Sequence, residues 1–361
     1  MRNSRLKSIF FCVALYCACT KSGGNIAPNI NVYVAGEIER FSVGQFNFPT
    51  YWKDNVAVDI IDTSMSGAAY SIAVYENDIY IAGLRGSRRT GNSTATYWKN
   101  GIAVDLSDGT TGDCAKSIAV TSNGIYAAGY GFNNKIGLPV TYVAKYWKNG
   151  QEFDLTDGAS DAVAFAIAVS GNDIYVAGYE FNGSPAIGSN GIAKYWKNGN
   201  EVALTDGTNN ASANAIVVEG NDVYVAGSEA SKAGYPAAKY WKNGIEADLS
   251  KGSESSSAES IAISGNDIYV AGYSYSGVVG NYIATYWKNG TPVYLTDGTL
   301  KAEAHSIAVF GNDVYVVGYE TNASGSSTVA KLWKNGVTTN LTDSTGLSEG
   351  GDAHQIFLST H

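Results

Sequence analysis

Seven positions in the chain carry side chains of different chemistry although their surroundings repeat. Each stands directly before a repeated pair in which Ser, Ala or Gln is followed by Ile. In chain order they are Tyr70, Lys116, Phe165, Asn214, Glu259, His305 and His354. Residues that every copy of a repeat shares build the frame, so residues that differ are free to contact a ligand. We therefore take these seven as candidate ligand-binding residues.

Three consecutive members of this series have side chains suited to catalysis or metal binding. Glu259, His305 and His354 supply a carboxylate and two imidazoles. Such groups bind divalent metal ions or act as general acid and base. However, the innermost strands around a channel can be spaced so widely that these three side chains do not meet. Residues at an exposed strand start can also differ between repeats without any role in ligand binding. The sequence therefore assigns no catalytic residue, no metal ligand and no cofactor.

The elements that position these residues come from a repeat. All seven tryptophans stand 45 to 49 residues apart in Tyr-Trp-Lys or Leu-Trp-Lys motifs: Trp52, Trp98, Trp147, Trp196, Trp241, Trp287 and Trp333. A second motif, of the form Ile-Tyr-Val-Ala-Gly, ends in Gly36, Gly83, Gly129, Gly178, Gly227, Gly272 and Gly318. A period of this length with several short strands predicts the blades of a β-propeller.

One repeat contains four predicted strands. Ser306–Val309 is typical of the first strand and Ile174–Gly178 of the second, and the third ends in Tyr-Trp-Lys. An Asn-Gly pair, as at 149–150, supplies the positive φ angles of a tight hairpin into the fourth strand. We expect the tryptophans to pack between blades. The aspartates that end the fourth strands are expected to bond their own turns.

The two ends of the chain each hold part of a repeat. The chain opens on a second-strand motif, Val32–Gly36, and closes on a first-strand motif, Ala353–Leu358. Pairing the two completes seven equal units, whereas an open array would leave both as exposed edges. The sequence thus predicts an all-β, seven-bladed β-propeller with four-stranded blades, closed by the C-terminal strand joining the N-terminal blade.

Residues 31–361 resemble the repeats of β-propeller proteins. The likeness is to the architecture, because the Gly-His and Trp-Asp pairs of WD repeats and the double glycine of kelch repeats are absent. The resemblance implies that the first strand of each blade is innermost. The seven candidate residues would then ring the mouth of the central channel, on the face that carries the long, variable loops.

Residues 1–18 resemble the signal peptide of bacterial lipoproteins. Basic residues precede an apolar run too short to span a bilayer, and Cys19 follows a small residue. The resemblance implies lipidation at Cys19, a flexible tether over 19–30, and export to the bacterial cell envelope, at the outer membrane or cell surface. Cys17 is an alternative lipidation site, and a plain secretory signal is an alternative interpretation.

Charge and motifs narrow the function. The net charge of −9 argues against a nucleic-acid partner, which needs a basic face. No nucleophile–base motif or phosphate-binding loop is evident. We expect a non-enzymatic, monomeric surface lipoprotein that binds a protein or glycan through its variable-loop face and touches the membrane only through its anchor. The alternative is a propeller enzyme, a polysaccharide hydrolase or lyase with its site at the channel mouth.

Overall fold

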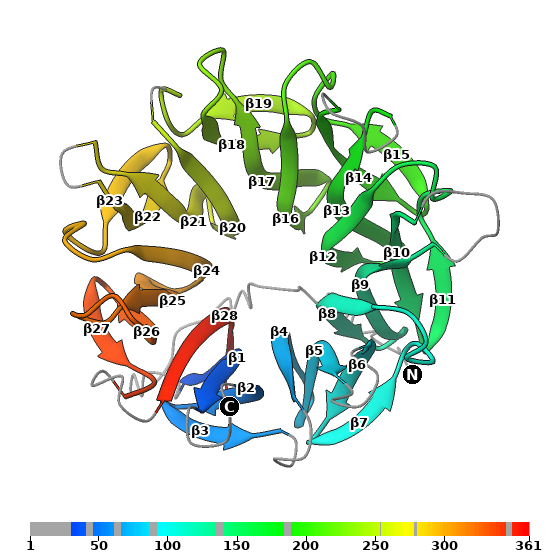
Figure 1. Cartoon of the computed structure of the whole chain (residues 1–361), viewed down its shortest axis with the longest axis horizontal. Helices are drawn as coiled ribbons and strands as arrows, with labels where there is room; N and C mark the ends of the chain where they lie inside the picture. The colour runs from blue at the N-terminus through cyan, green and yellow to red at the C-terminus, as the bar shows by residue number, and fades with distance from the viewer. Residues whose placement is uncertain are drawn as a thin grey trace, which may run out of the picture.

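The computed structural model describes residues 30–40, 46–60, 66–86, 92–133, 140–183, 189–252, 254–277, 280–343 and 349–360. These residues form seven antiparallel sheets of four strands each, arranged around one axis (Figure 1). The predicted all-β, seven-bladed propeller is thereby confirmed. The expected signal peptide and Cys19 lie outside the described residues, as does the tether apart from Ile30. Over the described ranges, no helix is long and apolar enough to cross a membrane.

Each blade arranges its strands in the same order outward from the axis. Blade 1 consists of β28, β1, β2 and β3, and blades 2 to 7 take the remaining strands four at a time in chain order. The innermost strands are β28 (Glu349–Thr360), β4 (Ser66–Tyr75), β8 (Cys114–Thr121), β12 (Ala162–Ser170), β16 (Ala211–Glu219), β20 (Ser256–Ser264) and β24 (Ala302–Phe310). The second strands are β1 (Ile30–Arg40), β5 (Asp78–Gly86), β9 (Gly124–Phe132), β13 (Asp173–Phe181), β17 (Asp222–Ala230), β21 (Asp267–Tyr275) and β25 (Asp313–Thr321).

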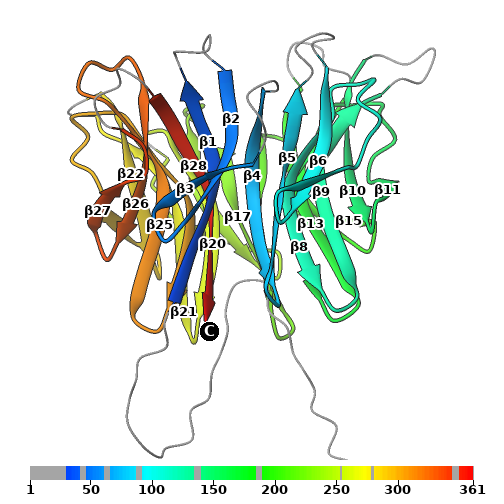
Figure 2. The same ribbon diagram turned by 90° about the horizontal axis from the view of Figure 1, so that it is seen from below.

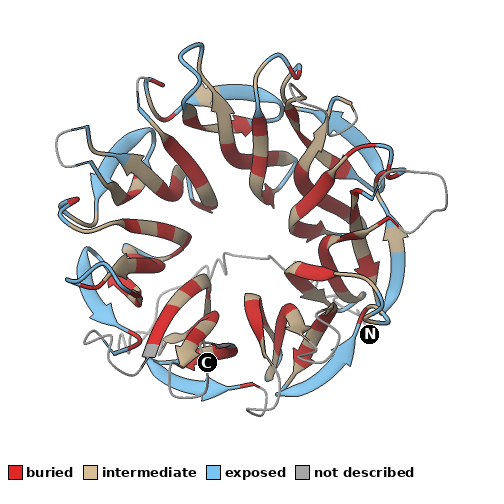
Figure 3. Cartoon of the chain, in the orientation of Figure 1, coloured by how far each residue is buried: buried red, intermediate tan, exposed pale blue. Residues whose placement is uncertain are grey.

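The outer half of each blade holds the other two strands. The third strands are β2 (Phe46–Lys53), β6 (Ser93–Lys99), β10 (Tyr142–Lys148), β14 (Gly191–Lys197), β18 (Pro236–Lys242), β22 (Tyr282–Lys288) and β26 (Thr328–Lys334). The outermost strands are β3 (Val56–Asp59), β7 (Ile102–Asp105), β11 (Gln151–Asp154), β15 (Asn200–Ala203), β19 (Ile245–Asp248), β23 (Thr291–Tyr294) and β27 (Val337–Asn340). These short strands form an exposed outer band around buried inner ones (Figure 3).

The tryptophans of the third strands hold neighbouring blades together. All seven are between 0% and 2% exposed. Trp98 of blade 2 packs with Tyr33 and Ile60 of blade 1, and Trp52 of blade 1 packs with Leu332 of blade 7. Burying a side chain of this size is a large apolar contribution to stability. The predicted packing of tryptophan between blades is confirmed.

The two faces of the disc differ in their turns. The hairpins that follow the innermost strands lie on the face where β28 ends, whereas β1 and β5 end on the opposite face (Figure 2). On the hairpin face Asn149 (φ 51°) and Gly150 (φ 82°) form the predicted tight turn. Asn149 Oδ1 also accepts a hydrogen bond of 2.9 Å from the backbone of Ile125, which joins the two hairpins of that blade.

The ends of the described chain close blade 1. β28 pairs antiparallel with β1 over its length, from Ile30 opposite Thr360 to Arg40 opposite Glu349, and the two lie side by side in Figure 1. Ile356, opposite Val34, is buried in the cluster that joins blades 1 and 7. The predicted closure by the C-terminal strand is therefore confirmed.

Candidate functional site

The seven candidate residues are each the unpaired residue of a β-bulge. In every innermost strand the register with the second strand shifts by one residue, as between Ala304 and Ser306 of β24. The residues skipped by the pairing are Tyr70, Lys116, Phe165, Asn214, Glu259, His305 and His354. A bulge frees one residue from the ladder and re-aims its side chain. The residues that differ between blades are thus the ones that have no partner in the pairing of the first and second strands.

The bulge also explains the glycine that ends each second-strand motif. Gly318 lies opposite Ala304, and a Cβ atom built on Gly318 would overlap the carbonyl oxygen of Glu303. The other six glycines of this motif meet the corresponding carbonyl oxygen in the same way. Only glycine allows two backbones to approach so closely. The repeated glycine therefore belongs to the frame that presents the variable residues.

Four of the seven residues form a run of contacts across four blades. The Nζ atom of Lys116 lies 3.5 Å from the centroid of the Tyr70 ring. The Tyr70 ring lies 5.2 Å from the His354 ring, which is stacked 5.8 Å from the His305 ring. These residues belong to blades 3, 2, 1 and 7 in turn, so their side chains meet across neighbouring blades around the axis.

The other three residues are arranged differently. Asn214 Nδ2 donates to Glu259 Oε2 at 3.3 Å and to the carbonyl oxygen of Ala258 at 3.0 Å, which links blades 5 and 6. Phe165 contacts Tyr179 of its own blade, with ring centroids 5.7 Å apart. Glu259 is therefore held by Asn214 and lies outside the histidine group.

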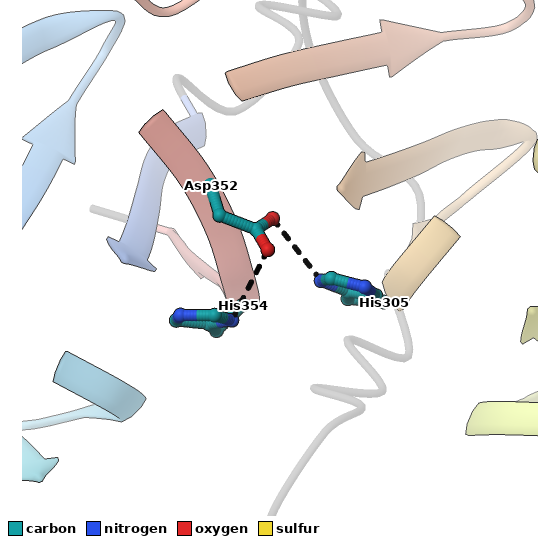
Figure 4. Close-up of side chains that lie close together, drawn as sticks. All are labelled: His305, Asp352 and His354. Atoms are coloured by element: carbon teal, nitrogen blue, oxygen red, sulfur yellow. Dashed lines mark ion pairs between the residues drawn. The ribbon is translucent and has the colours of Figure 1, made fainter. Parts of the chain in front are cut away.

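Asp352 is the carboxylate that meets both histidines. His305 Nδ1 lies 3.2 Å from Asp352 Oδ1, and His354 Nδ1 lies 4.0 Å from Asp352 Oδ2 (Figure 4). Asp352 and His354 belong to β28 and His305 to β24, so the group spans blades 1 and 7. One ligand atom from each of the three lies within 4.8 Å of the others. The sequence singled out both histidines but overlooked Asp352.

Each histidine faces a second carboxylate on its other side. His305 Nε2 lies 3.6 Å from Glu303 Oε2, and His354 Nε2 lies 3.9 Å from Glu37 Oε2. The hydroxyl of Tyr319 donates to Glu303 at 2.8 Å. The two imidazoles thus lie between carboxylates.

These charges shift one another's pKa values. Burial would raise the pKa of Asp352, but the charges of His305 and His354 outweigh burial and lower it to about 2. Burial would lower the pKa of His305, but the carboxylates of Asp352 and Glu303 raise it well above its ordinary value. The pKa of Glu259 is raised, chiefly by burial. In the metal-free group the neighbouring carboxylates therefore favour the protonated form of His305, and burial shifts Glu259 toward its protonated form.

Glu303 and Asp352, which the sequence analysis did not single out, occupy a second position of the repeat at which the residue differs between blades. The residues two positions before the bulge residues are Ala68, Cys114, Val163, Ser212, Ser257, Glu303 and Asp352. In an undistorted strand, residues two apart share a face. A carboxylate two residues before each histidine was therefore the available signal for the group.

On the hairpin side of the bulge residues the innermost strands enclose a small cavity. It has a volume of about 80 Å³ and is lined by six blades, with isoleucines such as Ile118 and Ile356 beside polar residues such as Ser117 and Gln355. Ser71 Oγ accepts a hydrogen bond of 3.0 Å from the backbone of Ile118, which joins adjacent innermost strands. The lining of this cavity is therefore mixed.

Two adjoining clefts lie between blades 2 and 3, near the end of β9. One, of about 500 Å³, is lined by Tyr130, Phe132 and Tyr142. The Tyr142 ring lies 5.0 Å from that of Tyr130 and 4.7 Å from that of Phe132. The other, of about 770 Å³, shares Phe132 and is lined by the carboxylates of Asp105, Asp108, Asp113, Glu152 and Asp154. Tyr130 pairs with Cys114, two residues before Lys116, so the first of these clefts lies near the start of β8.

Comparison with known proteins identifies the fold. No protein-family model matches the chain, and no curated protein matches its sequence. The β-propeller domain of the Trilobed protease from Pyrococcus furiosus, which has an open velcro topology, is 12% identical with a TM-score of 0.52, and the match covers 87% of this chain and 92% of that one. The acylaminoacyl peptidase from Pyrococcus horikoshii is 15% identical with a TM-score of 0.54, over 88% of this chain and 51% of that one. At these identities the likeness shows the propeller fold alone.

Proposed function

We propose that the protein is an exported, lipid-anchored glycan-binding protein that acts through its variable-loop face. The observation that supports a glycan is the cleft of Tyr130, Phe132 and Tyr142 beside the cleft lined by carboxylates. A sugar ring offers apolar C–H surface, which packs against aromatic rings, and hydroxyl groups, which donate to carboxylates. Ligand sites commonly combine such aromatic walls with a few polar groups.

The channel mouth extends this surface. Lys116 contacts Tyr70, and the contacts continue from Tyr70 to His354 and His305. In this proposal the seven bulge residues contact the ligand, and the protein acts as a monomer held to the membrane by its lipid. A protein partner is the alternative occupant of the same face.

A glycan array tests the proposal directly. Residues 25–361 retain every described contact, so this soluble fragment is a suitable probe. Phe132→Ala and Tyr142→Ala should each weaken retention at least about tenfold, because each removes an aromatic wall. Tyr294→Ala, at an exposed tyrosine of β23, is the matched control and should bind like the unchanged protein. If the array retains no glycan, or if Tyr294→Ala weakens glycan retention as much as Phe132→Ala does, the cleft is not a glycan site. A protein would then be the partner to test.

One feature favours a second candidate, a polysaccharide hydrolase or lyase acting at the channel mouth. The raised pKa of Glu259 favours a protonated carboxyl, which is the form that a general acid requires. Release of new chain ends from a polysaccharide, abolished by Glu259→Gln while retention is kept, would establish this activity. Retention without any cleavage would support binding alone.

A further inference from the structure

The group of His305, Asp352 and His354 contains buried polar atoms without hydrogen-bond partners. Within the described part of the chain, His305 Nδ1, Asp352 Oδ1 and His354 Nε2 are inaccessible and accept or donate no hydrogen bond. His305 Nδ1 and Asp352 Oδ1 lie 3.2 Å apart, a separation typical of two ligands of one small metal ion with bonds of about 2 Å. Buried polar atoms are nearly always satisfied, so the unsatisfied His305 Nδ1 and Asp352 Oδ1, this close together, indicate a missing partner between them. The unsatisfied His354 Nε2 lies on the other side of its ring, toward Glu37.

The outer sides of both imidazoles are arranged as in metal sites. A histidine that binds a metal through one ring nitrogen usually presents the other to a carboxylate, which fixes the orientation of the ring. Glu303 takes this position beside His305 Nε2, and Glu37 takes it beside His354 Nε2. The Nδ1 atoms of both rings are left facing Asp352.

The two outer carboxylates are themselves held in place. Glu303 pairs with Lys301 at 2.9 Å and accepts from Tyr319 at 2.8 Å. Glu37 accepts a hydrogen bond of 2.7 Å from Asn47 Nδ2. A second layer of this kind limits the movement of the imidazoles and favours one geometry at the centre of the group.

Aromatic rings pack against the two histidines. The Tyr319 ring meets the His305 ring edge-on at 5.5 Å, and the Tyr70 ring lies 5.2 Å from the His354 ring. The side chains of His305, His354 and Asp352 are about one-fifth exposed. The group is thus positioned by packing, and part of each side chain still meets solvent.

We propose that His305 Nδ1, His354 Nδ1 and Asp352 bind one Zn²⁺ ion, with Glu303 and Glu37 as the outer carboxylates. Two imidazole nitrogens and one carboxylate oxygen suit zinc, whereas calcium and magnesium prefer oxygen ligands throughout. Three protein ligands would leave the fourth position of a tetrahedral zinc ion to water or a ligand. This inference stands apart from the glycan proposal, because no contact that it uses involves the aromatic cleft.

Zinc titration of the fragment 25–361 tests the site. The protein is prepared without a histidine tag, stripped with a chelator and titrated near neutral pH. We expect one zinc ion per chain, with binding weakened at least about a hundredfold in His305→Gln and His354→Gln. Glu303→Gln should weaken binding about tenfold to a hundredfold, as removal of an outer carboxylate does. Glu201→Gln, at an exposed position of the outermost strand β15, should change affinity less than about threefold.

Two further measurements separate lost binding from lost folding. Zinc should raise the melting temperature of the unchanged protein and not that of the double variant His305→Gln/His354→Gln, whose metal-free melting shows whether it folds. Cobalt in place of zinc should give visible absorption bands that the double variant lacks. The site is refuted if the unchanged protein binds no stoichiometric zinc, or if Glu201→Gln loses as much affinity as His305→Gln.

Discussion

Gln355 Oε1 accepts a hydrogen bond of 2.6 Å from the backbone N–H of Ile72, so the last strand is tied to blade 2 as well as to β1. On the other side of blade 1, Trp52 Nε1 donates to the carbonyl oxygen of Leu341 in blade 7 at 3.0 Å. The closure of the ring therefore rests on contacts with both neighbouring blades and on the pairing of β28 with β1.

Replacing Gln355 by Ala should weaken the ring at this junction. The change leaves the Ile72 N–H buried without its acceptor, and we expect a loss of about 1–3 kcal/mol in the free energy of unfolding. Urea denaturation measures the loss, with Gln151→Ala at an exposed position of β11 as the control. Equal midpoints for the two variants would show that the hydrogen bond does not stabilise the ring.

Deleting Ala353–His361 should abolish cooperative unfolding. The deletion removes most of β28, including the buried Ile356, and leaves β1 as an unpaired edge. Thermal melting followed by circular dichroism distinguishes a lost transition from a shifted one. A truncated protein that melts like the full chain would contradict closure by the last strand.

Gly318→Ala should destabilise the protein by about 2–4 kcal/mol, because the new Cβ atom would overlap the Glu303 carbonyl oxygen and force the bulge apart. Gly183→Ala is the matched control, since no atom lies within 4 Å of a Cβ atom at Gly183. Chemical denaturation of both variants makes the comparison. If Gly318→Ala cost no more than its control, the close approach would not be the reason for the repeated glycine.

Much of this architecture was predictable from the sequence because seven copies of one unit repeat the same residues. The repeat also revealed the position of the bulge residues, because residues such as Glu259 and His305 differ between copies whose neighbouring residues are nearly the same. The bulge was not predictable, because a one-residue shift in register leaves no mark in composition. The meeting of His305 with Asp352 depends on the distance between innermost strands at the mouth, which the repeat pattern does not encode.

Cys114 should be inert in the folded protein. Its side chain is 1% exposed, and burial raises the pKa of the thiol to about 11. At pH 8 only about one thiol in a thousand is then ionised, so iodoacetamide should label the fragment 25–361 only after denaturation. Mass spectrometry reports the labelling. Rapid modification of the native protein at pH 8 would contradict the burial of this side chain.

The same shift gives a pH dependence of stability. The folded thiol keeps its proton up to a pKa of about 11, whereas an unfolded thiol loses it near its ordinary pKa. Between these values the unfolded state binds fewer protons, so the contribution of Cys114 to stability falls as pH rises. Cys114→Ala should remove this part of the alkaline decline, as measured by denaturation at several pH values.

Cys19→Ser should release the protein from membranes, because the proposed lipid would have no attachment atom. Fractionation of cells that express the full chain measures the shift from membrane to soluble fractions. Cys17→Ser is the control and should leave the protein in the membrane fraction. If only Cys17→Ser releases the protein from the membrane fraction, the lipid is attached at Cys17. If both variants stay in the membrane fraction, the protein is not anchored through a lipid on either cysteine.

The bulges separate recognition from architecture. Because each bulge residue lies outside the ladder, its replacement leaves the pairing partners and the repeated glycine opposite unchanged. The scaffold can therefore carry other side chains at the bulge positions, and those that contact each other, such as Asn214 and Glu259, would be exchanged together. A library randomised at these positions would sample new specificities while its members share one fold.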